Sequence, residues 1–161
     1  MEALLKRVQE LGFPRGSVLF VRAFVSLSCV RLDMFKAKME VFKSFGWSER
    51  DFLGALRKYP HLICLSRENI REKMEFLVGR AGCELAYITS HPMLLTFSLE
   101  KRLMPRHHVM NILKSSKLVE LEMSFYTVMI LSEKQFVERI IRRNMAQMPE
   151  LHDNYTAAIR S

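Results

Sequence analysis

The segment GWSERDFLGALRKYPHLICLS, residues 46–66, contains the pattern that decides the fold. It runs from a glycine through a stretch of helical periodicity to a proline, a short apolar turn and a serine. Pro60 is expected to end the first helix, because proline lacks an N–H donor and restricts the residue before it. Ser66 can cap a second helix by accepting a hydrogen bond from its free N–H groups. The segment therefore predicts two helices joined by a short turn.

This pattern is repeated along the chain. In residues 82–98, GCELAYITSHPMLLTFS, Pro92 precedes Ser98 by six residues, as Pro60 precedes Ser66. We expect a serine after an apolar residue to begin a helix in each repeat. Such pairs occur four times, with the serines 38, 32 and 34 residues apart: Leu27-Ser28, Leu65-Ser66, Phe97-Ser98 and Leu131-Ser132. A unit of this size cannot bury its apolar face alone, so the units are expected to stack as a solenoid.

Periodicity and helix caps both favour helix throughout. Ser48 with Asp51, and Ser132 with Gln135, resemble capping boxes. Alternating polar and apolar runs, which are typical of strands, are nearly absent. Apolar residues recur at helical spacing in several segments: Phe35, Met39 and Phe42; Ile70, Met74 and Leu77; Val109, Ile112 and Leu113. The sequence predicts an all-α fold, with about four repeats forming a single domain over residues 1–161.

Composition and charge narrow the class of protein. Hydrophobic residues make up 49% of the 161 residues and charged residues 26%, which is typical of globular domains. The 25 Lys and Arg exceed the 17 Asp and Glu, and the net charge of +8 favours a polyanionic partner, nucleic acid before an anionic membrane. The longest apolar stretch, residues 18–30, contains Arg22 and is too short to span a bilayer.

No residues form a recognisable catalytic or metal-binding motif. The sequence contains no phosphate-binding glycine loop, nucleophile elbow or zinc-protease motif. His107 and His108 would point about 100° apart on a helix, and Glu120 with Glu122 marks no identifiable pocket. The cysteines form no CxxC pair and are interpreted as small buried apolar residues: Cys29, Cys64 and Cys83. We therefore expect no enzyme activity, catalytic residue, cofactor, metal or small-molecule substrate.

Lysine and arginine side chains are the residues of this sequence that indicate a function. Residues 36–58 contain six cations and three anions, and residues 98–117 contain five cations and one anion. Cations at the same position of successive repeats would form a stripe that could follow a phosphate backbone. The candidate nucleic-acid-binding residues are Lys38, Lys43, Arg57, Lys58, Lys101, Arg102, Arg106, Arg142 and Arg143.

Structural roles for the same side chains are the alternative. Lys and Arg on helix surfaces are commonly solvated or paired with a nearby Glu. Arg102 lies inside the repeat motif and could hold two helices together. Arg106 follows Pro105 in a first helical turn, and could contact either a phosphate or a neighbouring carbonyl. The aromatic residues fall at core spacing, which favours packing over base stacking: Phe35, Phe42, Phe52, Phe76 and Phe136, with Trp47 as a packing anchor.

These segments resemble the plant branch of the mitochondrial transcription termination factor (mTERF) family. The best-fitting element is PMLLTFSLEKRLMPR, residues 92–106, which follows the family pattern P-x-L-L-x-x-S-L-E-K-R-x-x-P-R. The resemblance extends from about Gly12 to Tyr155. It implies a right-handed superhelical solenoid that binds nucleic acid in mitochondria or chloroplasts and acts in transcription termination, other transcription control or RNA processing. Double-stranded DNA is the favoured ligand, and RNA is the alternative.

Proteins of this family usually carry a transit peptide and further repeats ahead of this region. Glu2 and Glu10 interrupt the basic residues Lys6 and Arg7, so the N-terminus does not resemble a signal or transit peptide. We expect the chain to be a monomeric C-terminal portion of such a protein, without membrane contact. A hypothesis of another class is a protein–protein scaffold that holds a helical partner. Cations at matched repeat positions would favour nucleic acid, whereas an exposed apolar stripe would favour the scaffold.

Overall fold

Every regular element in the described part of the protein is helical. The computed structural model describes residues 1–116 and 123–160, which form α-helices, short 3₁₀ turns and π-helical segments. The all-α prediction is confirmed. The chain divides into two compact units, Met1–Thr96 and Phe97–Ser161, called unit 1 and unit 2 below.

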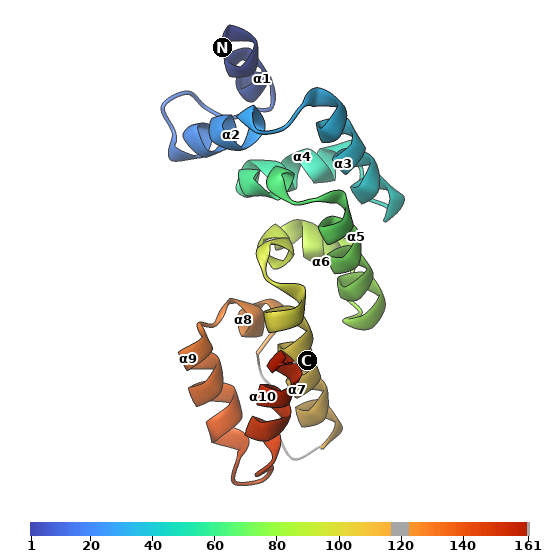
Figure 1. The fold of residues 1–161 in the computed structure, drawn as a ribbon, viewed down its shortest axis with the longest axis vertical. Helices are drawn as coiled ribbons and strands as arrows, with labels where there is room; N and C mark the ends of the chain where they lie inside the picture. Colours follow the sequence, from blue (N-terminus) through green and yellow to red (C-terminus); the bar gives the residue numbers. More distant parts are fainter. Residues whose placement is uncertain (117–122, 161) are drawn as a thin grey trace. The chain divides into compact units, whose positions relative to one another are not determined.

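Unit 1 contains three successive pairs of α-helices (Figure 1). They are α1 (Glu2–Glu10), α2 (Val18–Ser28), α3 (Leu32–Ser44), α4 (Glu49–Lys58), α5 (Arg67–Glu75) and α6 (Leu85–Ser90). A 3₁₀ turn follows α4 and another follows α6: η1 (Pro60–Cys64) and η3 (Pro92–Thr96). A π-helical segment, η2 (Phe76–Arg80), extends α5. Both 3₁₀ turns begin at a buried proline, so proline punctuates the repeats as the sequence pattern predicts.

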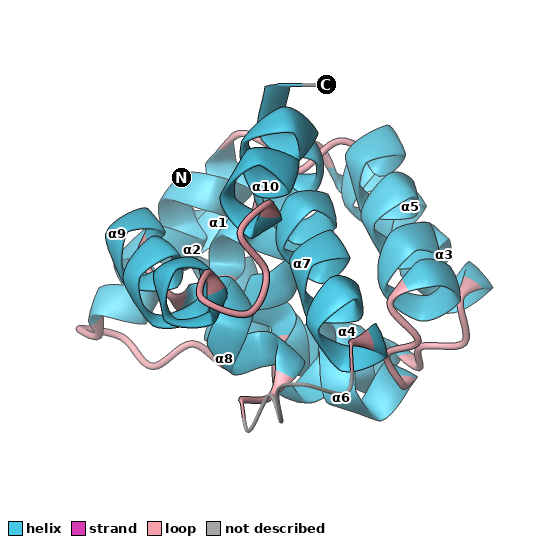
Figure 2. Cartoon of the chain, turned by 90° about the horizontal axis from the view of Figure 1, so that it is seen from below, coloured by secondary structure: helices cyan, strands magenta, loops and turns pink. Residues whose placement is uncertain are grey.

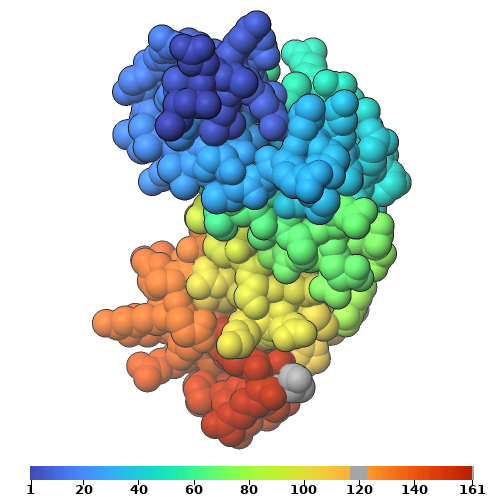
Figure 3. Space-filling view, turned by 45° about the horizontal axis from the view of Figure 1, so that its top comes forward, coloured from blue at the N-terminus to red at the C-terminus, as the bar shows by residue number. Residues whose placement is uncertain are grey.

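Each helix pair of unit 1 packs on the next. Helix α2 packs against η1, α3 against α5 and α4 against α6, and the colours of residues 1–96 follow one another in order over the surface (Figure 3). The rings of Phe42 and Trp47 stack 4.8 Å apart, and Phe52 lies 5.4 Å from Phe42 and 5.5 Å from Phe35. All four side chains are buried. The aromatic residues of this segment therefore form core, as their spacing predicts.

Unit 2 is arranged around helix α7 and the C-terminal helix α10 (Figure 2). Its elements are the π-helical η4 (Leu99–Leu103), α7 (Met104–Ser115), α8 (Phe125–Ile130), α9 (Glu133–Phe136), the π-helical η5 (Val137–Arg142) and α10 (Leu151–Arg160). Helix α10 packs against α7, η4 and η5. Phe136 and Tyr155 bring their ring centroids to 4.9 Å in the core of this unit.

Serine side chains cap three of the four predicted helix starts. Ser66, Ser98 and Ser132 each accept a hydrogen bond from the backbone N–H three residues later. The two predicted capping boxes, which begin at Ser48 and Ser132, are both present. These caps supply acceptors for N–H groups that have no partner inside their own helices.

The fourth predicted cap, Ser28, is wrong. Ser28 is the last residue of α2, and its hydroxyl donates to the carbonyl of Val25 at 2.7 Å. Helix α3 begins after Arg31, which takes the N-cap place with an extended backbone and no side-chain hydrogen bond. No proline interrupts residues 18–28, so the helical hydrogen bonds of α2 continue through the serine.

The predicted burial of the cysteines is also wrong. Cys29 and Cys64 are exposed and Cys83 is half-buried. Cys29 follows the end of α2 and Cys64 ends η1, so each lies where the chain turns at the surface.

Candidate nucleic-acid interface

Two of the nine candidate cations are buried and bound to the main chain. Lys38, on α3, is 7% exposed, and its Nζ donates to the carbonyl of Ile63 in η1 at 2.6 Å. Arg106, on α7, has no exposed surface. Both are among the candidate nucleic-acid-binding residues, and in this structure their side-chain donors contact main-chain carbonyls. Each lies within reach of main-chain carbonyl oxygens further along the chain, to which its side chain donates a hydrogen bond.

Arg106 joins three elements of unit 2. Its Nη1 donates to the carbonyls of Val128, Met129 and Leu131 at 2.9, 3.2 and 2.7 Å, around the end of α8. Its Nη2 donates to a carboxylate oxygen of Glu133 at 3.1 Å, and its guanidinium lies 4.5 Å from the centre of the Phe136 ring. Of the two roles open to Arg106 in the sequence, the structure supports the carbonyl contact.

The carboxylate of Glu133 is shared with a second buried group. The hydroxyl of Tyr155 donates to its two oxygens at 2.9 and 3.1 Å. Burial, and then this hydrogen bond, raise the pKa of Tyr155 to about 12. Arg106, Glu133 and Tyr155 therefore connect α7, α9 and α10 through one network.

Lys73 is a third cation of the same kind, and sequence reasoning missed it. It is 3% exposed, and its Nζ donates to the carbonyl of Leu95 in η3 at 2.8 Å. Burial lowers the pKa of both Lys73 and Lys38, since desolvation disfavours the charged form. The signal was present in the sequence as a cation three residues after a core position: Phe35 and Lys38, Ile70 and Lys73, Leu103 and Arg106. The cations at matched repeat positions are therefore structural.

Four further candidates are partly engaged by protein groups. The ammonium of Lys43 lies 3.2 Å from a carboxylate oxygen of Glu40. The Arg57 Nε donates to the carbonyl of Leu11 at 2.7 Å, and the Lys58 Nζ donates to that of Ser90 at 3.4 Å.

Arg102 is the fourth of these. Its Nη1 donates to the carbonyl of Met129 at 3.4 Å, and its guanidinium lies 4.9 Å from the centre of the Phe97 ring. Burial, followed by the nearby charge of Arg106, lowers its pKa. Arg102 therefore holds η4 against the end of α8, which is the structural role that the sequence left open.

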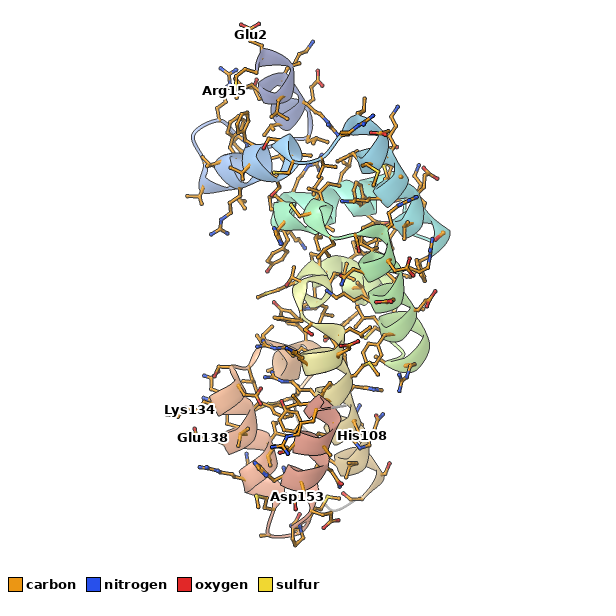
Figure 4. All side chains as sticks on the ribbon, in the orientation of Figure 1. Glu2, Arg15, His108, Lys134, Glu138 and Asp153 are labelled. Carbon is orange, nitrogen blue, oxygen red and sulfur yellow. The ribbon has the colours of Figure 1, made fainter. Side chains whose placement is uncertain are left out.

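The remaining three candidates are exposed and uncompensated. They are Lys101 in η4, Arg142 at the end of η5 and the following Arg143, and none has a protein partner within residues 1–116 and 123–160. All three belong to unit 2. Lys134, on the neighbouring α9, also points outward, beside Glu138 (Figure 4). These side chains can bind an anion without breaking a contact of the fold.

Other kinds of site find no support in the described residues. Among them, no three His, Cys, Asp or Glu side chains are placed to hold a metal ion, and none of their helices is long and apolar enough to cross a membrane. His107 lies beside Asn111, with 3.3 Å between their side-chain nitrogens, while His108 is exposed. Lys117, Glu120 and Glu122 lie outside the described residues.

Comparison with known proteins gives a consistent set of relatives. Residues 18–137 match the sequence profile of the mTERF family. In Arabidopsis thaliana, the chain is 29% identical over 99 residues to transcription termination factor MTERF15, mitochondrial, which is 58% of this chain and 22% of that protein. It is 31% identical over 85 residues to transcription termination factor MTEF18, mitochondrial (53% and 15%), and 25% identical over 101 residues to transcription termination factor MTERF8, chloroplastic (63% and 18%). The chain thus spans less than a quarter of these curated relatives. No solved structure matches it.

Proposed function

Because the chain belongs to the mTERF family, we propose that it binds nucleic acid and regulates transcription or its termination in a mitochondrion or chloroplast. Its relatives are named as mitochondrial or chloroplastic transcription termination factors. The favoured ligand is double-stranded DNA, bound by a monomer. The effect on transcription comes from occupancy of the template and from deformation of the duplex, and no catalytic step is involved.

The exposed, unpaired cations of unit 2 are the observation that carries this proposal. Among residues 1–116 and 123–160, no carboxylate pairs with Lys101, Arg142 or Arg143, so a phosphate can approach them without displacing one. Each phosphate they neutralise releases a condensed counterion, which is the main source of sequence-independent affinity for nucleic acid. The net charge of +8 adds long-range attraction.

The test is fluorescence anisotropy with a labelled duplex DNA and a labelled single-stranded RNA, each titrated at two or more salt concentrations. We expect binding to weaken steeply as salt rises. The variant Lys101→Ala/Arg142→Ala/Arg143→Ala should bind every sequence more weakly. Its log–log salt slope should be shallower by about 0.9 for each lost phosphate contact on duplex DNA.

A matched control removes the same charge from unit 1. Lys36, Arg50 and Arg71 are exposed cations, and their triple alanine variant should keep most of the affinity and slope. Equal losses in the two triple variants would show attraction by net charge alone and would reject the unit 2 surface. Tighter binding of RNA than of duplex DNA would replace transcription by RNA processing. Folded protein that binds neither ligand at low salt would refute the proposal.

A further inference from the structure

One face of α2 exposes large apolar side chains. Val18, Val21 and Val25 are 70%, 59% and 56% exposed. Their spacing of three and four residues places them on one side of the helix, over two turns. Soluble monomeric proteins seldom expose a contiguous apolar strip unless it contacts a partner. This is the exposed apolar stripe that the scaffold hypothesis requires.

The strip continues into a cleft within unit 1. Val21 and Val25 line one wall, and Tyr59 and Pro60, at the junction of α4 with η1, line the other. The cleft has a volume of about 410 Å³. Its walls come from α2 and from the junction of α4 with η1, and the concave space between them can receive an inserted side chain.

Basic side chains lie beside this apolar surface. Arg22, Lys58 and His61 line the cleft together with the apolar walls, and none of its lining residues is acidic. Residues 11–32, which include all of α2, contain no Asp or Glu. Arg22 and His61 have no hydrogen-bond or ion-pair partner among the described residues, and Lys58 has only the long 3.4 Å contact to a carbonyl. The charged rim is therefore available to an acidic ligand.

We propose that this cleft binds an amphipathic helix of a protein partner, with the apolar face of that helix on the valine strip and acidic residues beside the cationic rim. Two turns of exposed valine give an apolar surface as long as the span from i to i+7 over which a bound helix places its anchors in the helix-in-groove mode. Carboxylates at the edge of the ligand would pair with Arg22 and Lys58 and accept a hydrogen bond from His61. This interaction is independent of nucleic-acid binding by unit 2.

Charge argues against two other occupants. A second copy of α2 would bring Arg22 toward another Arg22, with no acidic residue in residues 11–32 to compensate. A nucleic acid would satisfy the cations, but it would leave the aliphatic wall of Val21 and Val25 against sugar and phosphate. An acidic amphipathic helix satisfies both parts of the surface.

The probe is a labelled amphipathic peptide of about 16 residues, long enough to form a helix, with leucines on one face and glutamates along both edges. One control peptide has the same composition in scrambled order, and another carries lysine in place of glutamate. Binding to the full chain is measured by fluorescence anisotropy. We expect the acidic amphipathic peptide to bind, and each control to bind at least about tenfold more weakly, since about 1.4 kcal/mol of lost contact suffices for that factor.

Surface variants locate the site. Val21→Ser/Val25→Ser should weaken peptide binding by roughly tenfold or more, because two valine side chains would lose their apolar contact. Val78→Ser is the matched control, since Val78 is an exposed valine on η2 that does not line the cleft, and should leave binding unchanged. Arg22→Glu should weaken the acidic peptide and strengthen the lysine peptide. Circular dichroism checks that each variant is folded.

Three results would overturn the proposal. They are no binding of the acidic peptide, equal binding of the scrambled peptide, and equal effects of the cleft variants and Val78→Ser. Loss of duplex or RNA binding in Val21→Ser/Val25→Ser, with nucleic acid displacing the peptide, would assign the cleft to the nucleic-acid surface instead. Failure of Lys101→Ala/Arg142→Ala/Arg143→Ala to weaken nucleic-acid binding would count against the unit 2 surface alone.

Discussion

Replacing Arg106 by methionine tests whether the buried cations hold the repeats together. Methionine keeps much of the side-chain volume and flexibility of arginine but removes every N–H donor. The carbonyls of Val128, Met129 and Leu131 belong to the main chain, so they stay in place and lose this donor. Exchange of a whole ion pair for apolar residues can be neutral, but here only one side of the interaction is removed.

The expected loss follows from these contacts. Each buried carbonyl left without a donor costs about 1 to 3 kcal/mol, which puts the loss for the three at about 3 kcal/mol or more. The carboxylate of Glu133 adds little to this figure, because that side chain is 56% exposed and keeps its hydrogen bonds from Tyr155. For a unit of the size of residues 97–161, each kcal/mol moves the melting temperature by roughly 4 to 8 °C, so a drop of more than roughly 10 °C is expected.

Urea denaturation of the full chain and thermal melting measure this loss. Lys101→Met is the matched control, since it removes one exposed positive charge from the preceding η4 and should change the free energy of unfolding by less than about 0.5 kcal/mol. Arg106→Lys should fall between, because one ammonium cannot reproduce the fork of donors. If Arg106→Met were no less stable than Lys101→Met, the inferred role of the carbonyl contacts would be wrong.

Three other perturbations test the core and the caps by urea denaturation. The pKa of Tyr155 is about 12 in the folded protein and about 10 in the unfolded protein, so the stability that its protonated hydroxyl contributes is full below pH 10 and is lost between pH 10 and 12. The difference in free energy of unfolding between wild type and Tyr155→Phe should therefore shrink by about 2 to 3 kcal/mol over that range. A constant difference would contradict this prediction. Ser66→Ala should cost about 1 kcal/mol and Ser28→Ala less than about 0.5 kcal/mol, because only Ser66 caps a helix; equal losses would show that the caps are misassigned. Gly54→Ala should stabilise α4 by about 0.5 to 1 kcal/mol, whereas Gly46→Ala should destabilise by more than about 1 kcal/mol, since Gly46 has φ +100° and its added methyl would lie 2.9 Å from a leucine side chain; the same sign for both would refute this.

The helices and most of their caps could be predicted from sequence because they depend on neighbouring residues. A proline ends a helix by its own covalent structure, and a serine cap needs only the three residues that follow it. Ser66 and Ser132 were predicted correctly on these grounds. Ser28 was not, because the same dipeptide can also end a helix, where its hydroxyl donates backward to a carbonyl.

The candidate site was harder to predict because burial of a cation depends on distant residues. Lys38 meets a carbonyl 25 residues later, and Lys73 meets one 22 residues later. The only local difference from the exposed Lys101 is the apolar residue three positions earlier, Phe35 or Ile70, where Lys101 has Ser98. The π-helical segment η4 adds to the difficulty. Lys73 lies seven residues after its cap Ser66, whereas Arg106 lies eight residues after its cap Ser98. Counting residues from the serine cap therefore does not show that the two cations occupy equivalent positions.

The regular position of the buried cations has a cause in the turn that they contact. A short 3₁₀ turn, or the end of α8, leaves carbonyl oxygens without helical N–H donors, and residues such as Ile63 and Leu95 hold those oxygens away from water. A long cationic side chain from the first helix of a pair can reach the turn that follows the second helix, so each such pair benefits from a cation at the same position. Recurrence of positive charge in this chain therefore marks a requirement of the fold. Residues that bind nucleic acid are better sought among cations at other positions of the repeat. Arg142 and Arg143 are examples, since both are exposed and unpaired among the described residues.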